Sequence, residues 1–133
     1  MTRFPSDAHL ASWARMCPGT DESAGKRGSG ATGRGNKWLR AALTEAARAA
    51  ARTKGTYLAA QYHRLVGRRG KNRAAVAVGH TILIALYHML RDGVTYEDLG
   101  PLYFDERDRQ ATVGRSVRRL EALGYRVTLE TAA

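Results

Sequence analysis

Apolar residues recur at helical spacing through most of the chain. Ser6 followed by Asp7 is typical of a helix N-cap, and Leu10 and Trp13 then fall on one face of a short helix. This first helix is expected to end near Met16, ahead of Pro18. The beginning of the chain is therefore predicted to be helical.

Three longer helices are predicted in the middle of the chain. Asn36 and Thr56 are good N-caps, Gly55 and Gly70 are good stops, and an alanine-rich apolar face follows Asn36. The third helix is apolar almost all round, as a central helix should be. Short turns join the three, which predicts antiparallel packing. Their predicted ranges are 37–54, 56–70 and 72–91.

The remaining segments are less regular. Residues 18–35 mix Gly, Ser and Thr with Lys and Arg, which predicts a loop or a loose hairpin outside the core. Residues 96–104 predict an irregular strap, residues 107–123 a last helix, and residues 125–129 a short strand or an extended tail. The expected fold is mainly α, a single domain over 1–133 with three parts: 1–35, 36–92 and 93–133.

The charge balance points to a polyanionic partner. The 133 residues include 22 Lys or Arg and 12 Asp or Glu, for a net charge of +10. Residues 15–73 hold 14 basic and 3 acidic residues, whereas residues 92–133 hold 6 and 8. Neutralising phosphates releases counterions, so the first half is expected to bind nucleic acid. A basic, solvated surface without a partner is the alternative.

The cysteine count and the apolar segments predict where in the cell the protein is found. A single cysteine, Cys17, cannot form an internal disulfide, which favours a reducing cytoplasm. The start of the chain has no apolar run of signal-peptide length, and residues 74–90 are interrupted by Gly79, His80 and His88. We therefore expect a soluble, cytoplasmic protein with no membrane partner.

The loop at residues 20–28 is the candidate for chemistry. Glycines let a backbone approach a phosphate closely, basic neighbours supply charge, and the Ser23 hydroxyl could attack phosphorus. Flexible basic loops also bind nucleic acid without chemistry, and spacing alone favours that alternative. Gly25-Lys26 is followed by Arg27 rather than Ser or Thr, so the segment is not a P-loop.

Cations cluster at this loop and at the start of the following helix, where the helix N-terminus adds partial positive charge. The candidate nucleic-acid-binding residues are Lys26, Arg27, Arg34, Lys37 and Arg40. Trp38 could stack on a base, but its helical spacing with Ala42 favours a core position.

No metal site is expected in this chain. The four histidines lack an H-E-x-x-H pattern, and His80 and His88 are expected to make buried hydrogen bonds. The carboxylates of the polar stretch are interpreted as solvated charges or caps rather than a two-metal centre. They are Asp98, Asp105, Glu106 and Asp108.

Several blocks of the sequence occur in the order and spacing of a known family. They are residues 9–14 (HLASWA), 17–19 (CPG), 22–27 (ESAGKR), 35–40 (GNKWLR), 45–47, 51–54, 57–62, 68–71, 77–80, 98–100 and 103–105. Over nearly its whole length the chain resembles the C-terminal domain of the IS110/IS116/IS902 insertion-sequence transposases, which include the Piv/MooV DNA invertases.

The resemblance implies a recombinase with two halves. In this family an N-terminal RuvC-like domain holds magnesium, and a serine of the C-terminal domain links covalently to DNA. Members are guided by a bridge RNA and act as oligomers in which the two halves meet across protomers. By position, Ser23 resembles the nucleophile, and Lys26 and Arg27 would lie against the scissile phosphate.

The start of the chain departs from the family pattern. Residues 1–5 resemble a mid-protein stretch, and the RuvC-like half is absent. We therefore expect a truncated transposase fragment that binds DNA and is inactive without a RuvC-like half or intact protomers. The alternatives are a non-catalytic nucleic-acid-binding remnant and a basic structural protein.

Overall fold

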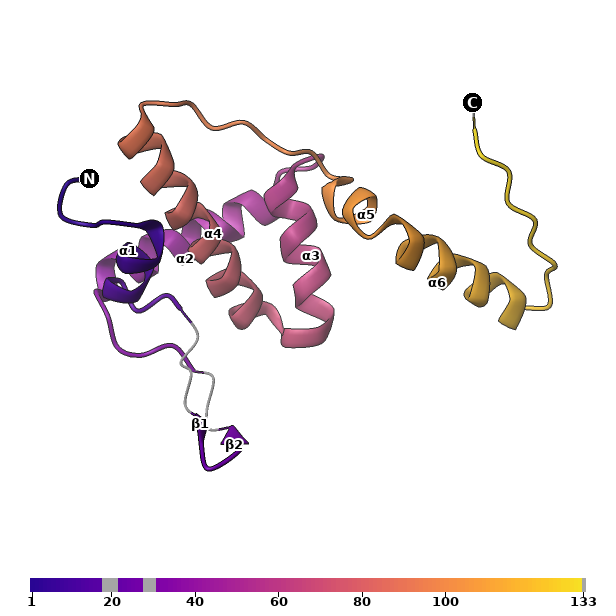
Figure 1. The fold of residues 1–133 in the computed structure, drawn as a ribbon, viewed down its shortest axis with the longest axis horizontal. Helices are drawn as coiled ribbons and strands as arrows, with labels where there is room; N and C mark the ends of the chain where they lie inside the picture. Colours follow the sequence, from indigo (N-terminus) through magenta and orange to yellow (C-terminus); the bar gives the residue numbers. More distant parts are fainter. Residues whose placement is uncertain (18–21, 28–30, 133) are drawn as a thin grey trace. The chain divides into compact units, whose positions relative to one another are not determined.

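The computed structural model describes residues 1–17, 22–27 and 31–132 (Figure 1). It is mainly helical, which confirms the predicted fold class. The chain divides into two compact units, Met1–Pro101 and Leu102–Ala133. The sequence prediction treated residues 1–133 as one domain. That the two units fold together stays a prediction.

Side chains cap the starts of three of the four helices described in the first unit. Ser6 accepts from the His9 N–H, Asn36 from the N–H groups of Trp38 and Leu39, and Thr56 from the Ala59 N–H. These side chains satisfy N–H groups that lack a partner within the helix. The helices are α1 (Asp7–Trp13), α2 (Lys37–Arg52), α3 (Tyr57–Arg69) and α4 (Lys71–Asp92).

The predicted central helix is confirmed as α4, which packs against α1, α2 and α3. Its Val78 and Tyr87 side chains are fully buried, and the Tyr87 hydroxyl donates to the Phe4 carbonyl over 2.9 Å. Gly79 lets α2 come close, because a Cβ there would lie 3.2 Å from the Leu43 carbonyl oxygen. Small residues at such crossings allow tight helix packing.

Among the described residues, α4 is the one helix whose length and mean hydropathy of 1.4 would suffice to cross a membrane. Core helices of folded proteins share both properties, and the buried side chains of α4 face its three neighbouring helices.

A strap of residues 93–101 ends the first unit and is tied to the start of α3. The Asp98 carboxylate accepts from the Tyr57 N–H at 2.9 Å, the Gly100 N–H at 2.8 Å and the Tyr96 hydroxyl at 3.1 Å. Asp98 therefore acts as a cap, one of the two roles that the sequence left open for it. The strap begins and ends earlier than the predicted range of residues 96–104, because a helix begins at Tyr103.

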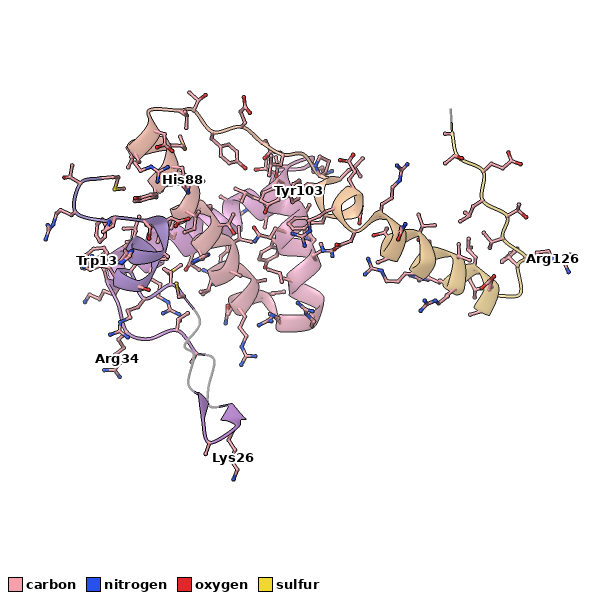
Figure 2. The ribbon with its side chains drawn as sticks, in the orientation of Figure 1. Trp13, Lys26, Arg34, His88, Tyr103 and Arg126 are labelled. Carbon is pink, nitrogen blue, oxygen red and sulfur yellow. The ribbon has the colours of Figure 1, made fainter. Side chains whose placement is uncertain are left out.

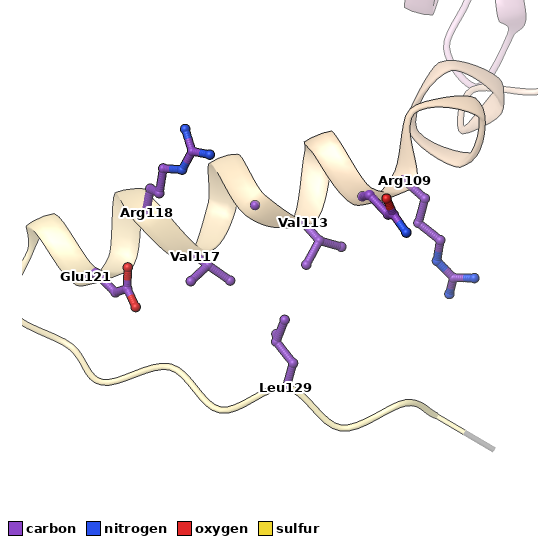
Figure 3. Close-up of a pocket in the computed structure, with 8 residues that line it drawn as sticks. Arg109, Val113, Val117, Arg118, Glu121 and Leu129 are labelled. Carbon is purple, nitrogen blue, oxygen red and sulfur yellow. The ribbon is translucent and has the colours of Figure 1, made fainter.

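The second unit consists of α5 (Tyr103–Arg107), α6 (Arg109–Ala122) and an extended tail. The predicted helix over residues 107–123 thus begins two residues later, at Arg109. The described tail contains no strand, so the extended alternative is the observed one. Leu129 of the tail lies beside Val113 and Val117 of α6, and together they line an open hollow of about 590 Å³ (Figure 3).

Candidate nucleic-acid interface

Ser23 lies in a two-stranded hairpin. Strand β1 (Glu22–Ser23) pairs antiparallel with β2 (Lys26–Arg27), and Ser23 lies directly opposite Lys26. The two turn residues, Ala24 and Gly25, have φ angles of 51° and 75°, as tight hairpin turns require. The described part of residues 18–35 thus contains the hairpin that the sequence left open as an alternative. Residues 18–21 and 28–30 and the side chains of Ser23 and Arg27 lie outside what the structure describes.

The chain that enters this segment is anchored in the core. After α1, the Met16 N–H donates to the Ala11 carbonyl and the Arg15 N–H to the Ser12 carbonyl, a Schellman ending with Arg15 at φ 54°. Met16 is then 1% exposed. Cys17 Sγ lies 3.8 Å from His80 Nε2 of α4. The backbone is therefore held up to residue 17.

The chain that leaves the segment returns to the same place. A Cβ on Gly35 would lie 2.3 Å from the Ala14 carbonyl oxygen, so only glycine fits against the end of α1. A Cβ on Gly33 would lie 3.3 Å from the Arg15 side chain. Residues 14–15 and 33–35 therefore form a common base, which we call the loop base, for the segment that carries Ser23.

The loop base is also tied to α2. Arg40 Nη1 donates to the Gly33 carbonyl at 3.3 Å, and Arg40 Nη2 donates to Thr32 Oγ1 at 2.5 Å. Of the predicted nucleic-acid-binding residues, Arg40 is thus half-buried and positions the loop. Its guanidinium is already engaged by the loop base, so Arg40 holds the shape of this segment.

The other cations with described side chains are exposed. Lys26 lies at the hairpin and Arg34 at the loop base (Figure 2). Lys37 lies at the first turn of α2. The N-terminus of α2 adds partial positive charge beside Arg34 and Lys37. This exposed charge favours an anionic partner at the loop base.

Trp38 does not lie in the core, contrary to the prediction from its spacing with Ala42. Its side chain is 75% exposed, and Lys37 Nζ lies 5.1 Å from the ring centroid. The buried face of α2 is formed by Leu43 and Ala47 instead. An exposed indole beside a cation is an arrangement that can stack on a nucleobase.

His88 joins α1 to the end of α4 at the surface rather than in the core. Its Nε2 lies 3.3 Å from Asp7 Oδ2 and its Nδ1 3.5 Å from Asp92 Oδ2, with the side chain 42% exposed. The Ala8 N–H and then His88 hold the pKa of Asp7 below its usual value. The expectation of a buried hydrogen bond was wrong for His88, whereas His80 is half-buried beside Cys17.

Sequence reasoning missed Arg15, and it did not foresee that Gly35 closes the loop base. The run of glycines predicted a flexible segment, but it did not predict which glycine packs against the end of α1. Pairing of residues 14 and 35 depends on tertiary packing of α1 against α4, which no local pattern reveals.

No group of three or more His, Cys, Asp or Glu side chains suitable for a metal occurs within residues 1–17, 22–27 and 31–132. An apolar hollow of about 250 Å³ in the first unit carries no charged group. It is lined by Ala46, Ala50, Leu58, Ile82, Ala85, Leu86, Met89 and Tyr96. The predicted site residues do not line it.

Comparison with known proteins gives one match. Residues 1–63 match the family described as Transposase IS116/IS110/IS902 family, and these residues include the hairpin, the loop base and α2. No curated protein matches the chain. No solved structure matches it either.

Proposed function

Because residues 1–63 match the IS116/IS110/IS902 transposase family, we propose that the chain belongs to this family and is the DNA-binding and strand-transfer part of an insertion-sequence transposase. Ser23 is its nucleophile. Lys26 and Arg27 contact the scissile phosphate, and Arg34 and Lys37 contact neighbouring phosphates. A RuvC-like half holds magnesium, and a bridge-type guide RNA selects the DNA.

The proposed step is a transesterification. The Ser23 oxygen forms a bond to phosphorus, the bond from phosphorus to one deoxyribose oxygen breaks, and the serine proton passes through solvent to that leaving oxygen. One phosphoester replaces another, so no oxidant, reductant or nucleotide is consumed. The energy of the broken DNA link is kept in the protein–DNA ester, which a second DNA end can then attack.

The loop base is the observation that carries this proposal. A nucleophile must be held near its target, because misplacement by an ångström costs much of the rate. The two ends of the Ser23 segment meet at Ala14, Arg15 and Gly35. A segment anchored at both ends keeps Ser23 within a restricted volume, while its glycines let the backbone approach phosphate.

Exposed charge and the exposed indole support nucleic acid as the partner. Lys26, Arg34 and Lys37 are exposed, and Trp38, which follows Lys37 in the sequence, is 75% exposed. Phosphate contacts supply sequence-independent affinity, and an indole adds stacking on an unpaired base. A non-catalytic nucleic-acid-binding protein would use the same surface, so binding alone does not separate the two functions.

The test is formation of a covalent adduct. The chain is incubated with labelled element-end DNA, magnesium, guide RNA and a RuvC-like half from an intact transposase of the same family. We expect a protein–DNA band that survives denaturation, requires the RuvC-like half and is lost in Ser23→Ala.

Ser12→Ala is the matched control, because Ser12 is an exposed serine of α1 outside the hairpin. It should form the adduct at the wild-type level. DNA binding without any adduct in the complete mixture would favour the non-catalytic alternative. An adduct that persists in Ser23→Ala would assign the nucleophile to another residue.

A further inference from the structure

A second group of cations lies away from the hairpin, at the corner where α3 turns into α4 (Figure 1). From residue 46 to residue 91 the sequence has nine Lys or Arg and no Asp or Glu. Four of the nine occur within six residues around Gly70, which has a φ of 79°. We call these four the corner cations: Arg68, Arg69, Lys71 and Arg73.

The corner cations have no protein partner among the residues that the structure describes. All four are exposed, and no ion pair or hydrogen bond joins them to another side chain in the part of the chain that the structure describes. By contrast, Arg48 is paired with Glu45 at 2.7 Å and Arg91 with Asp92 at 2.6 Å. The corner therefore concentrates positive charge that the protein itself leaves uncompensated.

Folding alone does not explain this arrangement. Arg68 and Arg69 are in the last turn of α3, where cations interact favourably with the helix dipole. Lys71 and Arg73 are in the first turn of α4, where the dipole disfavours them. That turn has no acidic residue, and Gly70 provides no side-chain cap. The second pair therefore opposes helix stability and needs a different reason.

We propose that the corner cations form a second binding site for the phosphodiester backbone of a nucleic-acid duplex, separate from the hairpin that carries Ser23. A duplex presents closely spaced phosphates that several side chains can contact at once. Arg68 and Arg69 lie before the tight turn at Gly70, and Lys71 and Arg73 lie after it. Four cations placed in this way fit a row of phosphates better than a single phosphate. The site is expected to position the duplex without reading its sequence.

The experiment measures how binding depends on salt. The full chain is titrated onto a duplex of about 30 base pairs, as DNA or as RNA of the same sequence, at several salt concentrations. Affinity falls as salt rises, and each phosphate contact to duplex DNA contributes about −0.9 to the slope of log affinity against log salt. We expect Arg68→Gln/Arg69→Gln and Lys71→Gln/Arg73→Gln each to make this slope less negative by about 1 to 2.

Arg48→Gln/Arg91→Gln is the matched control, since it removes the same charge from arginines that are already paired with carboxylates. Its slope should stay near that of the wild type. Equal slopes in the control and both corner variants would overturn the site. The DNA and RNA arms show which duplex it prefers.

Thermal unfolding separates binding from stability. Removing Lys71 and Arg73 should leave the midpoint unchanged or raise it, because both oppose the dipole of α4. Weaker binding together with an unchanged or higher midpoint is a result that a merely structural role cannot produce. Weaker binding that merely follows a lowered midpoint in both corner variants would contradict the site.

This site does not depend on the nucleophile. If both corner variants bind with the salt dependence of the wild type while the Ser23 adduct still forms, the second binding site alone is contradicted. If the corner variants show the weaker salt dependence but no adduct forms, the proposed recombination step alone is contradicted.

Discussion

The two units of the chain use similar helical sequence patterns with opposite results. In the first unit, apolar faces converge on α4, and Leu43, Leu83 and Tyr87 are each at most 4% exposed. In the second unit, α6 has apolar residues at positions 113, 117 and 120, yet none of its residues is buried. Helical periodicity therefore predicts a helix, but a core needs a second apolar surface to cover the first.

The candidate binding surfaces belong to the unit that has a core. The hairpin, the loop base and the corner cations are all attached to the first unit, whose core can hold them in place. The second unit has little buried area of its own. We therefore expect substitutions in the first unit to change folding strongly and equivalent substitutions in α6 to change it little.

Leu83→Ala should produce the largest effect. Leu83 is 4% exposed on α4 and belongs to the core cluster that also contains Met16 and Leu43. Its truncation removes buried apolar surface and leaves a cavity, which costs about 2–5 kcal/mol. Urea unfolding followed by far-UV circular dichroism measures the loss.

Leu90→Ala is the control for Leu83→Ala, because Leu90 is on the same helix and 66% exposed. It should cost less than about 1 kcal/mol. Similar losses for the two variants would mean that the core is not centred on α4, and the contrast between the two units would fail.

The sequence predicted most of the first unit because its signals are local. Asn36 and Thr56 cap the helices they were expected to cap, and the start of α2 at Lys37 is as predicted. Capping depends on residues within one helical turn, so neighbouring sequence is enough to find it. The start of α4 differed by one residue, because the helix begins at Lys71 rather than at residue 72.

The placement of Trp38 failed for a physical reason. Alanine is tolerated on both faces of a helix, so the alanine-rich α2 gives little contrast between buried and exposed sides. Ala42, which guided the prediction, is itself exposed, whereas Leu43 and Ala47 are buried. The larger residue Leu43 was the better guide.

The candidate site could be predicted only in part. The Gly/basic segment and its alternative as a hairpin follow from the mixture of Gly, Ser and Thr with Lys and Arg in residues 18–35. The loop base does not, because Gly35 and Ala14 meet only after α1 has packed on the bundle. The role of Ser23 stays a prediction that the adduct experiment tests.

Low pH should reduce the stability of the first unit by protonating Asp98 in the strap. Burial raises the pKa of Asp98, but the hydrogen bonds from Tyr57, Gly100 and Tyr96 outweigh it and leave this pKa below its usual value of 3.8. A carboxyl whose pKa is lower in the folded state stabilises folding above its unfolded pKa, and that stabilisation is lost as pH falls through the folded pKa. The loss should therefore occur below about pH 4.

The size of this effect is modest because Asp98 is exposed and solvent screens its charge, so we expect less than about 1 kcal/mol. Asp98→Asn keeps the size of the side chain and removes the charge. The difference in unfolding free energy between wild type and variant should shrink from pH 6 to pH 3. A difference that is constant over this range would mean that Asp98 stabilises the strap only through shape.

Val117→Thr in α6 should have the smallest effect. The substitution keeps the shape of the side chain and adds a hydroxyl, whose cost depends on how far the site is removed from water. Val117 is half-exposed beside Leu129, so the expected loss is below about 0.5 kcal/mol. Val78→Thr makes the same change at a fully buried position of α4 and should cost about 1–3 kcal/mol.

If Val117→Thr instead cost as much as Val78→Thr, and the cost grew with protein concentration, α6 would be covered in solution by a second copy of the chain. The second unit would then gain its core by association, and the contrast with the first unit would hold only for the isolated chain.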